Sequence, residues 1–280
     1  MPLPQKQPSA SIKRLARSYF TSSRNGPQLP LQRPTFSRVM DPYRQAPSWM
    51  SRRAYRSQPA YSNYKSASNV LYALIGLNSA IFVAWNVAAG ALPGLEPRQR
   101  IRLLNFMSRN FVCSKANVDQ GRWWTVVTST FSHQSLMHII GNMFSLHAFG
   151  SVVAAVGIGP LNTIIITLGA GLAGSVGYLY HESSKNPFQR SLGAMGASGS
   201  VMGMGAAAAC LAPKVTMLLF GVVPVPLWAL MIGYGVIDNY YLDRQTKVAH
   251  AGHIGGMVFG GMYYFARLRR FGGVASKGLW

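Results

Sequence analysis

The sequence predicts an all-α polytopic membrane protein, a bundle of six transmembrane helices. Hydrophobic residues make up 49% of the 280 residues and charged residues only 12%, whereas soluble domains carry about 25% charged residues. Five stretches contain no Asp, Glu, Lys or Arg at all: 66–95, 123–181, 191–213, 215–237 and 248–266. A helix needs about 20 apolar residues to cross a bilayer, so four stretches fit one span each and the longest fits two.

The six spans form one expected domain over residues 69–268. The motif "GIGP" at 157–160 marks the turn that divides the longest stretch. A short basic tail, 269–280, follows the domain. The spans are expected near 70–90, 132–153, 161–181, 192–211, 215–237 and 249–267.

Residues 1–68 differ in composition from the rest of the chain. They carry twelve Lys and Arg against a single acid, Asp41, and are rich in Ser, Pro and Gln. The stretch "SIKRLARSYF" at 11–20 reads as a short basic amphipathic helix. A basic, Ser-rich and acid-poor leader is typical of a mitochondrial transit peptide followed by a disordered matrix tail. A disordered cytosolic tail attracted to anionic lipid is the alternative.

The net charge of +21 does not indicate a nucleic-acid partner, because the excess lies in the tail and in loops between spans. With six spans, both termini lie on one face together with most of the basic residues, which favours a matrix-facing N-terminus. The two cysteines, Cys113 and Cys210, are not expected to form a disulfide. No metal-ligand spacing or nucleotide motif is present, so no metal or other cofactor is expected.

The first loop, 91–131, contains the stretch "EPRQRIRLLNFMSRNF". A helix over it places Arg98, Arg102 and Arg109 on one stripe and apolar residues on another. We expect this helix to lie at the membrane interface.

Polar residues in the second span indicate a structural or functional role, because placing polar side chains in lipid is energetically unfavourable. His138 and Asn142 are four residues apart and therefore share one helix face. Alone, such a pair is typical of hydrogen bonding between helices. We expect His133 to be interfacial and assign His147, His181 and His250 no role.

The fourth and sixth spans carry matching stripes of small residues. Such stripes let two helices approach closely, and His253 lies beside the seam. Ser198 lies near the outer end of the fourth span, within "GASGS". The glycines expected to support this packing are Gly196, Gly199, Gly203, Gly252, Gly256 and Gly260.

The alternating direction of the spans brings these polar residues to one depth. At 1.5 Å per residue, Ser198, His253, His138 and Asn142 all lie roughly 6–15 Å below the same face. A serine becomes a nucleophile when a neighbouring base takes its proton, a role open to His253. Asn142, His138 and the backbone N–H of Ser198 would stabilise an oxyanion. Since the spans contain no carboxylate, the sequence predicts a serine–histidine dyad.

At these residues the chain resembles the rhomboid family of intramembrane serine proteases, closest to its mitochondrial inner-membrane, presenilin-associated branch. The matching motifs are "GASG" at 196–199, "HIIGN" at 138–142 and "AHAGHIGGMVFG" at 249–260. The resemblance implies Ser198 as nucleophile, His253 as general base, and His138 and Asn142 around the oxyanion. It also implies single-span membrane proteins as substrates, cut in or near the bilayer. A mobile fifth span, 215–237, is implied to shape lateral access, although its prolines also fit a purely structural kink.

The chain departs from the family pattern at some positions, and two alternative functions stay open. Mitochondrial members often carry a span before the six, which is not evident here, and Met202 stands where bacterial members often have Tyr. A non-catalytic rhomboid-like protein that binds or escorts membrane helices would not need both Ser198 and His253. A small transporter or channel would favour charged residues or inverted repeats within the spans.

Overall fold

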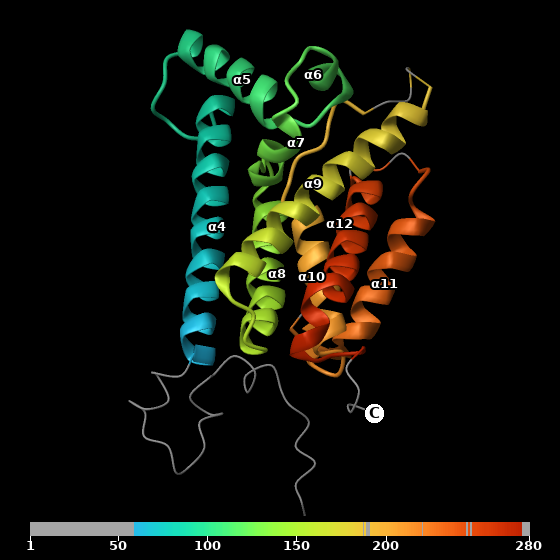
Figure 1. The fold of residues 1–280 in the computed structure, drawn as a ribbon. Helices are drawn as coiled ribbons and strands as arrows, with labels where there is room; N and C mark the ends of the chain where they lie inside the picture. The colour runs from blue at the N-terminus through green and yellow to red at the C-terminus, as the bar shows by residue number, and fades with distance from the viewer. Residues whose placement is uncertain are drawn as a thin grey trace, which may run out of the picture. The chain divides into compact units, whose positions relative to one another are not determined.

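The computed structural model describes residues 59–186, 188, 191–219, 221–244, 246 and 248–275. These residues belong to one compact unit. It is mostly helical (Figure 1), as predicted. The expected leader lies outside the described residues as far as residue 58, and so do the last five residues of the C-terminal tail.

Helix α4, Pro59–Ala89, begins ten residues before the predicted start of the domain at 69. Proline is well suited to a first helical turn, where its missing N–H is not needed. The charge-free stretch that predicted this span begins only at residue 66, because Lys65 lies near the start of the helix. Residues 59–68 are therefore helical and not part of a disordered tail.

The first loop forms α5, Pro97–Phe111, which crosses near the end of α4 (Figure 1). Glu96 and Gln99 form a capping box at its start. Ile101 and Phe106 are 61% and 55% exposed, which suits an amphipathic interfacial helix. Three short elements then lead to the second span: α6 (Lys115–Asp119), α7 (Thr125–Thr128) and the 3-10 turn η2 (Ser129–Phe131).

Helices α8, Leu136–Ala155, and α9, Pro160–Ser184, follow the predicted spans closely. Together with residues 61–89 of α4, they are the described helices that are long and apolar enough to cross a membrane. Helix α10, Ser198–Leu211, is apolar but shorter. The count of six spans therefore stays a prediction.

Helix α10 occupies the middle of the bundle, between α8, α9 and α12 (Figure 1). It starts at Ser198 and not near residue 192, because residues 191–197 form an extended segment that is held by hydrogen bonds to other elements. Most of its side chains are buried, among them Met202 and Met204. Ser198, the first residue of α10, is thus held in place by the core that surrounds the helix.

The predicted fifth span, 215–237, was wrong in its first half. Strands β1 (Thr216–Leu219) and β2 (Val223–Pro226) form an antiparallel hairpin there, and α11 covers only Leu227–Tyr240. Alternating valines and prolines in β2 disfavour a helix. The last helix, α12, covers His250–Tyr263 and continues as a π-helical turn, η4 (Tyr264–Leu268), and a 3-10 turn, η5 (Arg269–Phe271).

Candidate active site

The segment before Ser198 is anchored at four backbone positions. Ser191 N–H donates to Glu182 Oε2 at 2.7 Å. Ala194 exchanges two backbone hydrogen bonds with Cys113, which belongs to the first loop. Gly196 N–H donates to the carbonyl of Ser129 at 2.9 Å, and Ala197 N–H donates to His133 Nε2 at 3.2 Å. Ser198 is therefore positioned by α9, the first loop and the segment just before α8 together.

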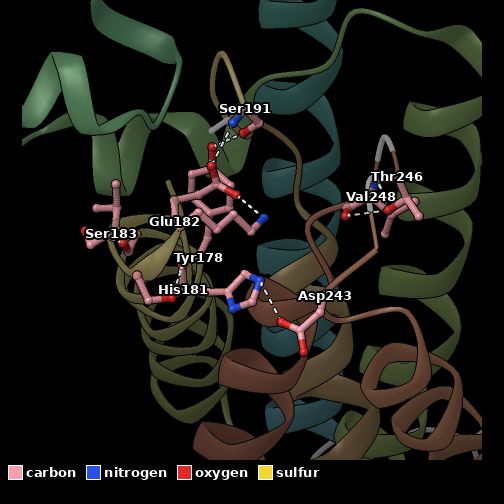
Figure 2. A network of polar contacts seen from close by, with 11 residues as sticks. Tyr178, His181, Glu182, Ser183, Ser191, Asp243, Thr246 and Val248 are labelled. Carbon is pink, nitrogen blue, oxygen red and sulfur yellow. Dashed lines mark hydrogen bonds and ion pairs between the residues drawn. The ribbon is translucent and has the colours of Figure 1, made fainter. Parts of the chain in front are cut away.

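Figure 2 shows the outer part of this anchor. The Glu182 carboxylate accepts a hydrogen bond from Lys185 Nζ as well as from Ser191 N–H, and the Tyr178 hydroxyl contacts the Ser191 hydroxyl. His181 Nε2 lies 3.8 Å from a carboxylate oxygen of Asp243, which follows α11. Because the Asp243 side chain is 89% exposed, that pair contributes little to stability.

The structure distinguishes the two serines at the start of α10. The Ser200 hydroxyl is fully buried and donates to the carbonyl of Thr167 on α9. Ser198 is partly exposed and lines a cavity of about 40 Å³. A buried water needs roughly 10–15 Å³, so the cavity has room for water. Its wall also includes Cys113, Ser129, Ser175, Tyr178 and Gly252.

Gly252 brings the start of α12 to the same cavity, and His253 is the next residue. His253 and His138 on α8 lie close enough for their charged forms to repel each other. His138 and Asn142 both lie against Gly196, because a Cβ at Gly196 would meet His138 Nε2 at 3.0 Å and Asn142 Nδ2 at 3.6 Å. The φ of Gly196 is +132°, which also favours glycine. The structure therefore brings the four predicted polar residues to one end of the bundle.

The close contact of α10 and α12 depends on glycine. A Cβ at Gly256 would lie 2.1 Å from the carbonyl oxygen of Gly199, and one at Gly260 would lie 2.0 Å from that of Gly203. Gly252 instead faces Gly174 on α9. Gly196 lies outside the helical seam, in the extended segment before α10.

Sequence reasoning missed the carboxylate that contacts His253. The Nδ1 of His253 lies 3.0 Å from Asp238 Oδ1, and the Nδ1 of His250 lies 2.7 Å from the same oxygen. Asp238 is 3% exposed. The prediction that no carboxylate orients His253 was wrong because α11 continues to Tyr240, past the charge-free stretch that ends at residue 237.

His133 is the second missed residue, since it is completely buried and not interfacial. It lies in the loop before α8, and its Nε2 accepts hydrogen bonds from Asn142 Nδ2 at 2.9 Å and from Ala197 N–H. Burial and the neighbouring His138 lower the pKa of His133 to about 4. The ring is therefore neutral at physiological pH, which leaves Nε2 free to accept. The Asn142 amide keeps its second N–H for another acceptor.

Residues 120–270 match the family model described as the Rhomboid domain. The chain is 29% identical over 219 residues to the mitochondrial RHOMBOID-like protein 12 of Arabidopsis thaliana, covering 73% of this chain and 60% of that protein. It is 27% identical to an uncharacterized mitochondrial rhomboid protein of Schizosaccharomyces pombe, covering 74% and 66% of the two chains.

A third relative is the mitochondrial presenilin-associated rhomboid-like protein A of Danio rerio. The identity is 26% over 211 residues, which cover 72% of this chain and 49% of that protein. In all three comparisons the match spans less than two thirds of the relative's length.

Proposed function

This chain belongs to the rhomboid family, in its mitochondrial branch, and we propose that it is an intramembrane serine protease. In this proposal it hydrolyses peptide bonds in or near the membrane helices of single-span proteins. The observation that carries the proposal is the placement of Ser198 and the start of α12 on one cavity, with His253 held by Asp238.

In the proposed mechanism, Ser198 Oγ attacks the scissile carbonyl and transfers its proton to Nε2 of His253. The Nδ1–H of His253 donates to Asp238, which fixes the tautomer that leaves Nε2 free to act as a base. The protonated His253 then gives its proton to the leaving amine, and an acyl ester forms on Ser198. Water from the cavity hydrolyses this ester through the same base, which regenerates the hydroxyl.

The negative charge on the substrate oxygen is stabilised by three donors in this proposal. Ser198 is the first residue of α10, so its N–H has no partner within the helix. The second N–H of Asn142 and a ring N–H of His138 approach from α8, beside Gly196. His133 sets the orientation of the Asn142 amide. Donors that are fixed before the reaction stabilise the developing charge most effectively.

The chain is a mitochondrial membrane protein. We place it in the inner membrane with the site open to the intermembrane space, as the distribution of basic residues favours. The α5 helix and α11 would then border the route by which a substrate helix reaches Ser198.

The proposal is tested by co-reconstituting the purified chain with candidate single-span inner-membrane proteins and sequencing any new N-termini. Ser198→Ala should abolish cleavage and fluorophosphonate labelling. Ser200→Ala is the matched control, since it should lose one buried hydrogen bond, about 1 kcal/mol, yet keep cleavage. Cleavage that persists in Ser198→Ala would refute the assignment, and a wild-type protein that binds single-span helices without labelling would support the non-catalytic alternative.

A further inference from the structure

Asp238, His250 and His253 form a cluster of three potential metal ligands. The Nδ1 atoms of both histidines approach a single carboxylate oxygen, at 2.7 and 3.0 Å. The three ligand atoms all lie within 4.8 Å of one another. A tetrahedral Zn²⁺ site with bonds of about 2.0–2.1 Å holds its ligands about 3.4 Å apart, so small shifts of the side chains would admit the ion.

The hydrogen bonds of the cluster are incomplete among the described residues. Asp238 Oδ2 and His250 Nε2 are both buried and have no hydrogen-bond partner there. Buried polar atoms usually have a hydrogen-bond partner. Here both histidines approach Asp238 Oδ1, and Asp238 Oδ2 has no hydrogen-bond partner among the described residues. A cation at the centre would engage the carboxylate and both rings together.

The ligand types favour Zn²⁺. Two imidazoles and a carboxylate are a common protein ligand set for this ion, with a water in the fourth position. The single carboxylate of Asp238 neutralises only half of the charge of Zn²⁺, which suits reversible binding. The cluster lies where α11 ends and α12 begins, with the partly exposed ring of Tyr241 stacked on His250.

We propose that Asp238, His250 and His253 bind Zn²⁺ and that the bound ion inhibits the protease. A neutral imidazole carries one ring proton. When Nδ1 of His253 ligates the metal, that proton must reside on Nε2, which then donates a hydrogen bond and no longer accepts a proton from Ser198. The ion also occupies the Asp238 oxygen that otherwise orients the ring. The inhibition, though not the binding, rests on the proposed function.

Binding is measured with Co²⁺, which reports tetrahedral nitrogen and oxygen ligation by its visible absorption. The full chain with Ser198→Ala should develop this absorption, and excess Zn²⁺ should remove it. His250→Gln should weaken Co²⁺ binding at least tenfold, while His147→Gln, a histidine that contacts Tyr72 on α4, should bind as the parent does. Absence of the absorption, or equal binding by the His250 variant, overturns the proposal.

Inhibition is measured separately, by cleavage and fluorophosphonate labelling of the protein with its native Ser198. Zn²⁺ should suppress both, EDTA should restore them, and His250→Gln should need at least tenfold more Zn²⁺ relative to its own uninhibited rate. Equal sensitivity of that variant overturns the inhibitory role. Metal binding in a protein that is never labelled would refute the protease and leave the binding site standing.

Discussion

Asp238 Oδ1 accepts a hydrogen bond from the Nδ1–H of His253, and the Nδ1 of His250 contacts the same oxygen. A general base of a serine hydrolase needs its free nitrogen directed at the hydroxyl, and a buried acceptor on the other nitrogen enforces this tautomer. In our proposal Asp238 is a positioning residue, because it acts on the reaction through His253. The predicted dyad then becomes a triad.

Asp238→Asn should lower kcat by about 10²- to 10⁴-fold with little change in KM, because the amide can donate a hydrogen bond to Nδ1 and so favour the wrong tautomer. Cleavage kinetics with a reconstituted substrate measure this change. Asp243→Asn is the control, since that carboxylate is 89% exposed and lies beyond α11. A kcat that is unaffected in Asp238→Asn would remove the residue from the mechanism.

At the residue scale, the sequence predicted the reacting groups but not the groups that hold them. The motifs mark Ser198 and His253, whereas Asp238 stands just past a charge-free stretch, where a loop is expected. The pair His250 and His253, three residues apart on one helix face, was the signal for a shared partner. His133 gave no signal, because its contacts to Asn142 and Ala197 arise only when the chain folds.

At the element scale, the seam between α10 and α12 sets how closely the serine and histidine helices approach. Gly256 and Gly199 touch through backbone atoms, as do Gly260 and Gly203. Helix contacts of this kind leave no space for even a methyl group, so each glycine determines the distance between the helices.

Gly256→Ala should force α10 and α12 apart and destabilise the fold by about 1–3 kcal/mol, with a large loss of activity. Gly261→Ala is the matched control in the same helix, because among the described residues no atom lies within 4 Å of the position that its Cβ would take. Thermal unfolding in detergent and cleavage rates compare the two. Equal behaviour of both variants would show that the seam tolerates side chains.

The helices that the sequence predicted best are those with long charge-free stretches. Helices α8 and α9 matched because charge and length agree with the bilayer. The stretch 215–237 failed because hydrophobicity alone does not separate a strand from a helix. The alternation in "VPVP" and the turn glycine Gly221, with a φ of +75°, were the local signals for the hairpin.

At the scale of the whole molecule, the buried His133 makes the stability of the fold depend on pH. The pKa of His133 falls from an ordinary 6.5 to about 4 through burial and the nearby His138. The unfolded chain therefore takes up a proton at a higher pH than the folded chain. Stability is retained above about pH 6.5 and is lost as the pH falls toward 4.

The melting temperature in detergent should thus decrease between about pH 7 and pH 5. His133→Gln should melt lower than the wild type at pH 7, because Nε2 no longer accepts from Asn142 and Ala197, but its further decrease on acidification should be smaller. Parallel curves for the two proteins would show that other groups govern the acid sensitivity.

Ser198 and Asp238 lie on elements that are held in place by different contacts. The segment before Ser198 is held by hydrogen bonds to α9, the first loop and the segment just before α8, and none of these hydrogen bonds involves α11. Asp238 lies on α11, the helix whose predicted mobility would shape lateral access. In our proposal, outward motion of α11 would separate Asp238 from His253, so the open state would be inactive. Cleavage would then require α11 to close again around the bound substrate helix, which would protect membrane proteins that only pass the open site.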